Sequence, residues 1–120
     1  MARVLIVDDG PFMRNFIKSM LLDREHEVVG EAENGQEAIE KYMELQPDLI
    51  TLDITMPVMD GLKALRVIKE YNPSVKVIMI SASGQEDNVK EAIRNGASSF
   101  LMKPFTADTL YTVLDEVLNI

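Results

Sequence analysis

The chain has 120 residues, of which 20 are acidic and 12 are basic, so its formal net charge is −8 at pH 7. This length is enough for one domain and too short for a second folding unit. The acidity argues against nucleic acid or an anionic membrane as a direct partner. The chain has no cysteine, which excludes disulfides and thiolate zinc sites and favours a cytoplasmic location. The partners that remain are proteins and cations.

We expect neither a signal peptide nor a membrane span near the N-terminus, because the apolar run there is interrupted at once by Asp8 and Asp9. Short, mostly apolar runs predict buried strands, and the segments between them have the three-and-four spacing of amphipathic helices. In chain order, the strands are expected at residues 4–7, 27–31, 49–52, 75–80 and 100–102, and helical spacing covers 13–21, 34–45, 62–68, 89–93 and 110–118. Pro47 ends the second helix, Asn72 and Pro73 stop the third, and Gly96 follows the fourth as a C-terminal cap.

This order of elements is five repeats of a strand followed by a helix. It predicts an α/β fold, a doubly wound (βα)5 parallel sheet with right-handed crossovers and helices on both faces. The sequence contains no internal repeat, low-complexity tract or linker, so we expect residues 1–120 to form a single domain with no output domain attached. Nothing in the sequence demands more than a monomer.

Reactive side chains stand at the ends of four of the predicted strands. Asp8 and Asp9 follow the first, Asp53 the third, Ser81 the fourth and Lys103 the fifth. Ligands of parallel sheets bind at the carboxyl ends of the strands. We therefore expect three carboxylates, a hydroxyl and an ammonium group to meet at one site.

Three crowded aspartates would repel one another unless one is protonated or a cation is bound. A site built from oxygen atoms suits Mg²⁺, which takes one or two carboxylates and completes its shell with water and phosphate oxygens. The alternative is that Asp9 caps a helix beginning near Pro11 and that Asp53 starts a turn. Capping explains one aspartate and not three.

With a cation in place, one carboxylate can attack a phosphoryl group while an ammonium and a hydroxyl group bind the oxygens in transfer. Asp53 is the best candidate for the nucleophile because it stands alone on a central strand, which leaves Asp8 and Asp9 to hold the cation. Lys103 and Ser81 fit the other two roles. The product would be an acyl phosphate.

These residues occur in the order and spacing of a known family. The carriers are Val7-Asp8-Asp9 with Phe12-Met13-Arg14, residues 53–61 (DITMPVMDG), Ser81-Ala82, and Lys103-Pro104-Phe105. The chain resembles the response-regulator receiver domains of two-component signalling over all 120 residues. The resemblance implies a flavodoxin-like sheet with strand order 2-1-3-4-5 and a signalling switch that catalyses only its own phosphorylation and dephosphorylation.

The resemblance also implies residue roles. Asp53 would accept a phosphoryl group from the phosphohistidine of a histidine kinase, and Asp8, Asp9, Asp53 and the backbone carbonyl of Thr55 would bind Mg²⁺. Lys103, followed by a cis peptide bond to Pro104, would pair with the phosphoryl oxygens. The switch would be a movement of Ser81 toward the phosphoryl group and of Phe100 inward behind it. Its output would be a binding face on the fourth helix, fifth strand and fifth helix.

Some positions depart from the common pattern. Gly10 and Pro11 after the acidic pair are less usual, Ser81 replaces a threonine, and Phe100 replaces a tyrosine and fits plain core as well as a switch. His26, between two glutamates, is interpreted as a solvated surface residue.

The Met13-Arg14 pair and residues 81–85 (SASGQ) favour a chemotaxis regulator that acts on a flagellar motor switch protein. The alternatives are a stand-alone receiver or phosphorelay intermediate of another pathway, and a Mg²⁺-dependent aspartyl-phosphate phosphatase. The phosphatase is disfavoured because such enzymes have a second aspartate where this chain has Thr55. A flavodoxin-like electron carrier is disfavoured because Asp8 and Asp9 would repel its phosphate. An unphosphorylated interaction domain would normally have lost Asp9, Asp53 or Lys103.

Overall fold

The computed structural model describes residues 1–82 and 86–119. Over these residues, five strands alternate with five helices, and all ten predicted elements are present. Ser83, Gly84 and Gln85, part of the stretch that favoured a chemotaxis regulator, lie outside the described residues. The elements are β1 (Arg3–Val7), α1 (Pro11–Asp23), β2 (Glu27–Ala32), α2 (Gly35–Leu45), β3 (Leu49–Asp53), α3 (Gly61–Tyr71), β4 (Lys76–Ala82), α4 (Glu86–Arg94), β5 (Ser99–Lys103) and α5 (Ala107–Leu118).

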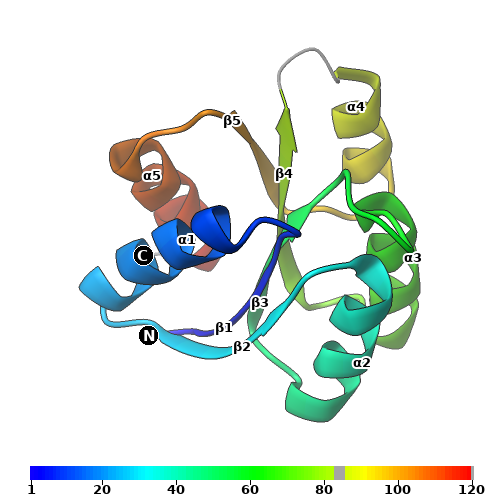
Figure 1. Ribbon diagram of the computed structural model, residues 1–120, viewed down its shortest axis with the longest axis horizontal. Coiled ribbons are helices and arrows are strands. Elements are labelled where there is room, and N and C mark those ends of the chain that lie inside the picture. Colours follow the sequence, from blue (N-terminus) through cyan, green and yellow to red (C-terminus); the bar gives the residue numbers. More distant parts are fainter. Residues whose placement is uncertain (83–85, 120) are drawn as a thin grey trace.

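The strands form one parallel sheet in the order β2-β1-β3-β4-β5 (Figure 1). This confirms both the doubly wound α/β fold and the strand order that the resemblance implied. The chain adds β2 on one side of β1 and then returns to add β3 on the other side. The order therefore reverses between β1 and β3, and a crevice for a ligand opens at such a point, at the carboxyl ends of the strands.

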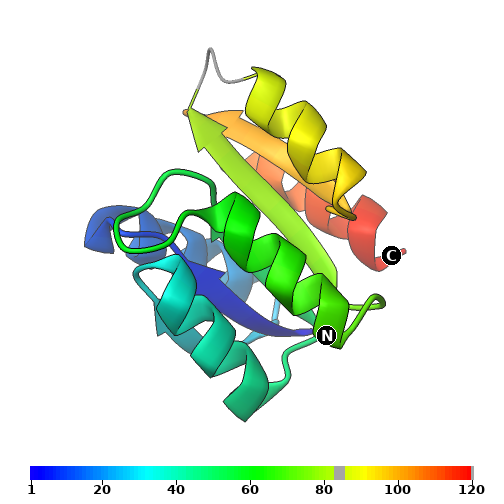
Figure 2. The same cartoon turned by 90° about the vertical axis from the view of Figure 1, so that its right-hand side faces the viewer.

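Helices cover both faces of the sheet, with α1 and α5 on one face and α2, α3 and α4 on the other (Figures 1 and 2). Successive side chains of a strand point to opposite faces, so Val4 and Ile6 of β1 pack in the layer with α1 and α5, whereas Leu5 and Val7 pack in the layer with α2 and α3. Every residue of β3 is buried. The two apolar layers pack against opposite faces of the sheet, and this packing positions the residues at its rim.

Side-chain caps fix where several helices begin. The Asn34 side chain accepts a hydrogen bond from the Glu37 amide at 2.9 Å, and the Asp60 side chain accepts one from the Lys63 amide at 2.9 Å. Helix α1 starts at Pro11, and its N-cap position is Gly10, which has no side chain. The alternative that Asp9 serves as the helix cap is therefore wrong.

His26 is buried, and the expectation of a solvated histidine was wrong. Only 5% of its surface is exposed, and its Nδ1 atom accepts a hydrogen bond from the backbone amide of Ala2 at 3.0 Å. That amide belongs to the residue before β1 and needs an acceptor away from water. Burial is the largest cause that lowers the pKa of His26, and the positive charges of the N-terminus and Arg24 lower it further.

Candidate functional site

The structure brings the reactive side chains predicted at the strand ends to one edge of the sheet. Asp8 directly follows β1, and Asp53 and Lys103 are the last residues of β3 and β5. Ser81 lies inside β4, one residue beyond Ile80, the ladder partner of Asp53. The predicted convergence is therefore confirmed for the three aspartates and Lys103, and Ser81 lies on the neighbouring strand.

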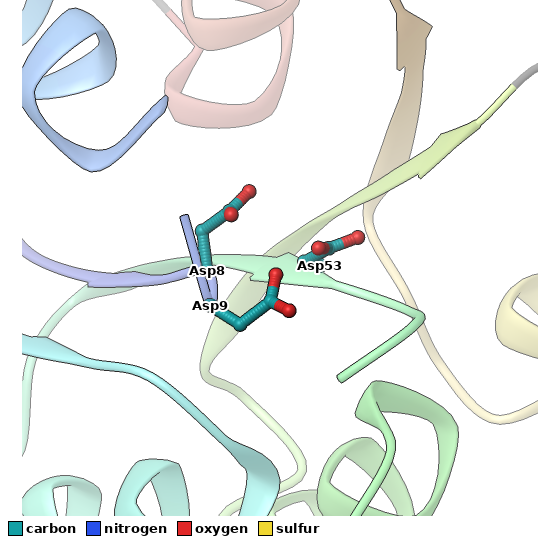
Figure 3. A group of neighbouring side chains, drawn as sticks. All are labelled: Asp8, Asp9 and Asp53. Atoms are coloured by element: carbon teal, nitrogen blue, oxygen red, sulfur yellow. The ribbon is translucent and has the colours of Figure 1, made fainter. Parts of the chain in front are cut away.

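The three aspartates form a compact cluster, and their side chains lie close together (Figure 3). Each residue offers one carboxylate oxygen, and these atoms all lie within 4.8 Å of one another. Asp8 and Asp53 are 1% and 5% exposed, whereas Asp9 is exposed to solvent. Two carboxylates thus form the floor of the cluster and the third closes it from the solvent side.

Lys103 joins the two buried carboxylates. Its Nζ atom lies 3.0 Å from Asp8 Oδ2 and 3.3 Å from Asp53 Oδ2. Burial opposes the charge on the ammonium, but the hydrogen bond to Asp8 and the negative charge of Asp53 outweigh it and raise the pKa of Lys103. The lysine is therefore a fixed positive charge at neutral pH.

The carboxylate of Asp53 is destabilised in its ionised form. Burial is the largest cause, and the charge of Asp8 adds to it, so that the pKa of Asp53 is raised to about 6 even though Lys103 acts in the opposite direction. At neutral pH Asp53 is mostly ionised. Its negative charge is poorly compensated, so an added cation would stabilise it.

The backbone around the cluster is tightly constrained. The Asp8 amide donates to the carbonyl of Ala32 at 3.0 Å, and the Gly10 amide donates to Asp8 Oδ1 at 2.8 Å. Gly61 packs directly against the end of β3, where a Cβ atom would overlap the carbonyl oxygen of Asp53. This close approach explains why α3 opens with a glycine.

The residues present fit a magnesium ion. All three aspartates offer oxygen donors, which hard divalent cations prefer. Their three negative charges are opposed at the site by the single positive charge of Lys103, so two negative charges remain among the described residues of the cluster. The triad therefore has the composition and the geometry of a magnesium site.

The structure also places the other residues that the sequence singled out. Thr55 is exposed in the loop between β3 and α3, and the peptide bond between Lys103 and Pro104 is cis. Ser81 is buried, and its hydroxyl donates to the carbonyl of Ala82 at 3.1 Å. Phe100 is 41% exposed, so the interpretation of this residue as plain core is wrong.

One residue at the site had no role in the sequence-based prediction. Arg14 donates from Nη1 to the backbone carbonyl of Asp8 at 2.6 Å and from Nε to Glu31 Oε1 at 3.2 Å. Arg14 was noted as part of a motif, but no signal in the sequence shows that its guanidinium returns to the loop before its own helix.

Comparison with known proteins identifies the family. The response regulator receiver domain family matches residues 4–115. The chain belongs to this family. The chemotaxis protein CheY of Listeria monocytogenes is 54% identical over 116 residues, which are 97% of this chain and 98% of that protein. CheY of Bacillus subtilis is 51% identical over 117 residues, which are 98% of each chain.

Solved structures agree with this result. The receiver matches the crystal structure of the CheX-CheY-BeF3-Mg²⁺ complex from Borrelia burgdorferi with a TM-score of 0.93 and 36% identity, covering 97% of this chain and 88% of that one. The protein is thus a CheY-like response regulator of chemotaxis signalling, with an acidic pocket formed by Asp8, Asp9 and Asp53. It is a signalling receiver and not an enzyme with a substrate of its own, and a kinase and a downstream protein are its partners.

Within residues 1–82 and 86–119, the helices lack the combination of length and apolar character that a bilayer span requires.

Proposed function

We propose that the receiver accepts a phosphoryl group on Asp53 from the phosphohistidine of a histidine kinase, and that phosphorylation changes its affinity for a downstream protein. The position of the Asp53 carboxylate carries this proposal. It lies at the end of the central strand β3, is almost fully buried, and is 3.3 Å from the ammonium of Lys103. A nucleophile, a fixed positive charge and two further carboxylates are what phosphoryl transfer to a carboxylate needs.

In the transfer, an oxygen of Asp53 forms a bond to phosphorus while the bond between phosphorus and the imidazole nitrogen breaks. The released imidazole keeps the electron pair of that bond and takes up a proton. Asp53 must be ionised to attack, and a pKa of about 6 leaves it so at neutral pH. Lys103, already at the carboxylate, is placed to stabilise the negative charge on the phosphoryl oxygens.

In this proposal, Mg²⁺ is bound by Asp8, Asp9, Asp53 and the backbone carbonyl of Thr55. When bound, it supplies positive charge opposite the phosphoryl oxygens. The Borrelia complex supports this assignment, because it contains both BeF3 and Mg²⁺, and a BeF3 group bound to an oxygen atom has the tetrahedral shape of a phosphoryl group. Asp8 also pairs with Lys103, which keeps the lysine in place before a phosphoryl group arrives.

The readout that we propose is a movement of Ser81 toward the phosphoryl group and of Phe100 inward behind it, which reshapes the face formed by α4, β5 and α5. The ladder supports this coupling, since Ser81 and Met79 of β4 lie opposite Met102 and Phe100 of β5. We propose a flagellar motor switch protein as the target, because chemotaxis proteins are among the relatives. The lack of cysteine supports a cytoplasmic location.

Intact-mass spectrometry after incubation with acetyl phosphate tests the proposal. We expect one phosphoryl group per chain in the wild type, dependent on Mg²⁺ and labile to hydroxylamine, as an acyl phosphate is. Asp53→Asn should give no adduct. Asp108→Asn, an exposed position in the first turn of α5, is the matched control and should be modified like the wild type.

An adduct that persists in the Asp53→Asn variant would move the acceptor to another residue. No adduct with acetyl phosphate, phosphoramidate or a phosphorylated kinase would contradict the proposal and favour an unphosphorylated interaction domain.

A further inference from the structure

The guanidinium of Arg14 connects three parts of the fold at the metal-binding loop. It extends from α1, donates to the backbone carbonyl of Asp8 at 2.6 Å, and pairs with Glu31 near the end of β2 at 3.2 Å. We infer that Arg14 is a positioning residue for the cation site, which holds the Asp8-Asp9 peptide so that both carboxylates face Asp53. This inference rests on the proposed function only in assuming that the three aspartates bind Mg²⁺.

The carbonyl that Arg14 binds belongs to the peptide bond between Asp8 and Asp9. The orientation of that peptide decides in which direction Asp9 leaves the loop. The other polar groups of Asp8 are also held, because its amide donates to Ala32 and its carboxylate binds Lys103 and the Gly10 amide. Asp9 is exposed, and its direction depends on the peptide before it. Arg14 therefore acts on Asp9 through the backbone.

A shift in the sheet register supplies the anchor for Arg14. Val4 of β1 pairs with Val28, but the next residue pairs with Gly30, so β2 contains one extra residue, and Glu31 comes to lie opposite Ile6. With an unbroken register, Glu31 would lie opposite Val7 and point to the face that α2 covers. The shift turns Glu31 to the α1 face, where Arg14 and Lys18 reach it.

If Arg14 positions the aspartates, its removal should change the affinity for Mg²⁺ in one direction, and if Arg14 acts only through its charge, in the opposite direction. Removing a positive charge near an acidic cluster should strengthen cation binding, if the charge is all that matters. Removing a group that orients a ligand should weaken it, by about 10-fold or more for partners that hold the ligands in place. The sign of the change in affinity therefore separates the two roles.

Lys18 provides a matched control. It lies on the same helix one turn later, has the same charge, and pairs with the same glutamate at 3.5 Å, whereas Arg14 alone of the two is hydrogen-bonded to the Asp8 carbonyl. The experiment is calorimetric titration of the metal-free protein with MgCl₂ at pH 7.5. It compares wild type, Arg14→Met, Arg14→Lys and Lys18→Met, each checked for folding by circular dichroism and amide NMR spectra.

We expect Arg14→Met to weaken Mg²⁺ binding by about 10-fold, and Lys18→Met to leave it within about two-fold of the wild type or slightly tighter. Arg14→Lys keeps the charge, but a single ammonium group cannot replace the forked guanidinium, which donates to both the Asp8 carbonyl and Glu31. It should therefore also weaken binding, and it should shift the amide resonances of Asp9 and Gly10 in the metal-free protein. This variant keeps the test decisive if Arg14→Met does not fold.

Unchanged or tighter Mg²⁺ binding in both Arg14 variants would overturn the inference. Equal weakening by Lys18→Met would also overturn it, because the effect would then belong to the shared partner Glu31 and not to the hydrogen bond with the Asp8 carbonyl. A wild-type protein that binds no Mg²⁺ would contradict the cation site of the proposed function instead, so the two failures can be told apart.

Discussion

The side chain of Thr51 is buried in the middle of the central strand. It is 0% exposed, and its hydroxyl has no hydrogen-bond partner among the residues that the structure describes. An unpaired buried hydroxyl is destabilising, because it has lost its water without gaining a partner. Valine has nearly the same shape without the hydroxyl. We therefore expect Thr51→Val to raise the free energy of unfolding by about 1–2 kcal/mol, measured by urea denaturation followed by circular dichroism.

Thr51→Ser is the control for this prediction, since it keeps the hydroxyl and loses the methyl group. It should lower the free energy of unfolding by about 1 kcal/mol. If Thr51→Val is the less stable variant, the hydroxyl has a partner in solution and the interpretation is wrong.

At the scale of residues, the sequence located the acidic cluster because a simple topological rule applies to it. Asp53 and Lys103 end their strands, and Asp8 follows one directly, so the rule that parallel strands share a rim was sufficient. Their chemical roles remain predictions. His26 and Phe100 could not be placed in the same way. The burial of His26 depends on a hydrogen bond to Ala2, 24 residues away in the sequence, and the exposure of Phe100 depends on how α4 and α5 flank an edge strand.

At the scale of elements, periodicity was enough to predict every strand and helix. β3 and the interior of β4 are mostly apolar and buried, and the helices carry clear apolar faces. What periodicity could not predict is register. The extra residue in β2, which turns Glu31 toward Arg14, leaves no mark in the sequence, because an inserted residue in a short strand looks like any other.

The loop between β3 and α3 contains a strained residue. Val58 has φ 68°, although it is β-branched, and the Met59 amide donates to the carbonyl of Pro57 at 2.7 Å across it. Its side chain is 83% exposed, so little apolar burial would be lost by removing it. We expect Val58→Gly to raise the free energy of unfolding by about 1 kcal/mol, as the relief of strain exceeds the conformational entropy of glycine.

Val58→Ala is the comparison that decides this prediction, with both variants measured by urea denaturation at pH 7.5. At an ordinary exposed position, glycine is less stable than alanine by about 0.5–1 kcal/mol. At a position with positive φ the order should be reversed. A glycine variant that is less stable than the alanine variant would show that Val58 is not strained.

At the scale of the whole molecule, two buried groups at opposite ends of the sheet respond to pH in opposite senses. The raised pKa of Asp53 means that the folded protein holds its proton more tightly than the unfolded chain, so this group stabilises the fold at low pH and loses that contribution as the pH rises through about 6. The lowered pKa of His26 means that the unfolded chain takes up the proton first, so stability is lost as the pH falls below 6.5.

Between pH 5 and pH 7.5 the two groups change the stability of the wild type in opposite directions. A variant that lacks one of them should show the effect of the other. On going from pH 7.5 to pH 5.0 without divalent cations, Asp53→Asn should lose about 1 kcal/mol of stability relative to the wild type. His26→Asn, whose amide oxygen can still accept from the Ala2 amide, should gain stability relative to the wild type over the same interval. The measurement is urea unfolding of the three proteins at the two pH values, with EDTA present.

Each variant changes one buried group, so its difference from the wild type reports that group together with the charges around it. The surrounding charges are Asp8, Asp9 and Lys103 for the first group, and the N-terminus, Arg24 and Asp115 for the second. If His26→Asn follows the wild type, His26 is solvated in solution. If Asp53→Asn changes in stability as the wild type does, the pKa of Asp53 is near its ordinary value. The site then does not destabilise the ionised carboxylate of Asp53. If all three proteins change in stability by the same amount, neither Asp53 nor His26 has a shifted pKa in the folded protein.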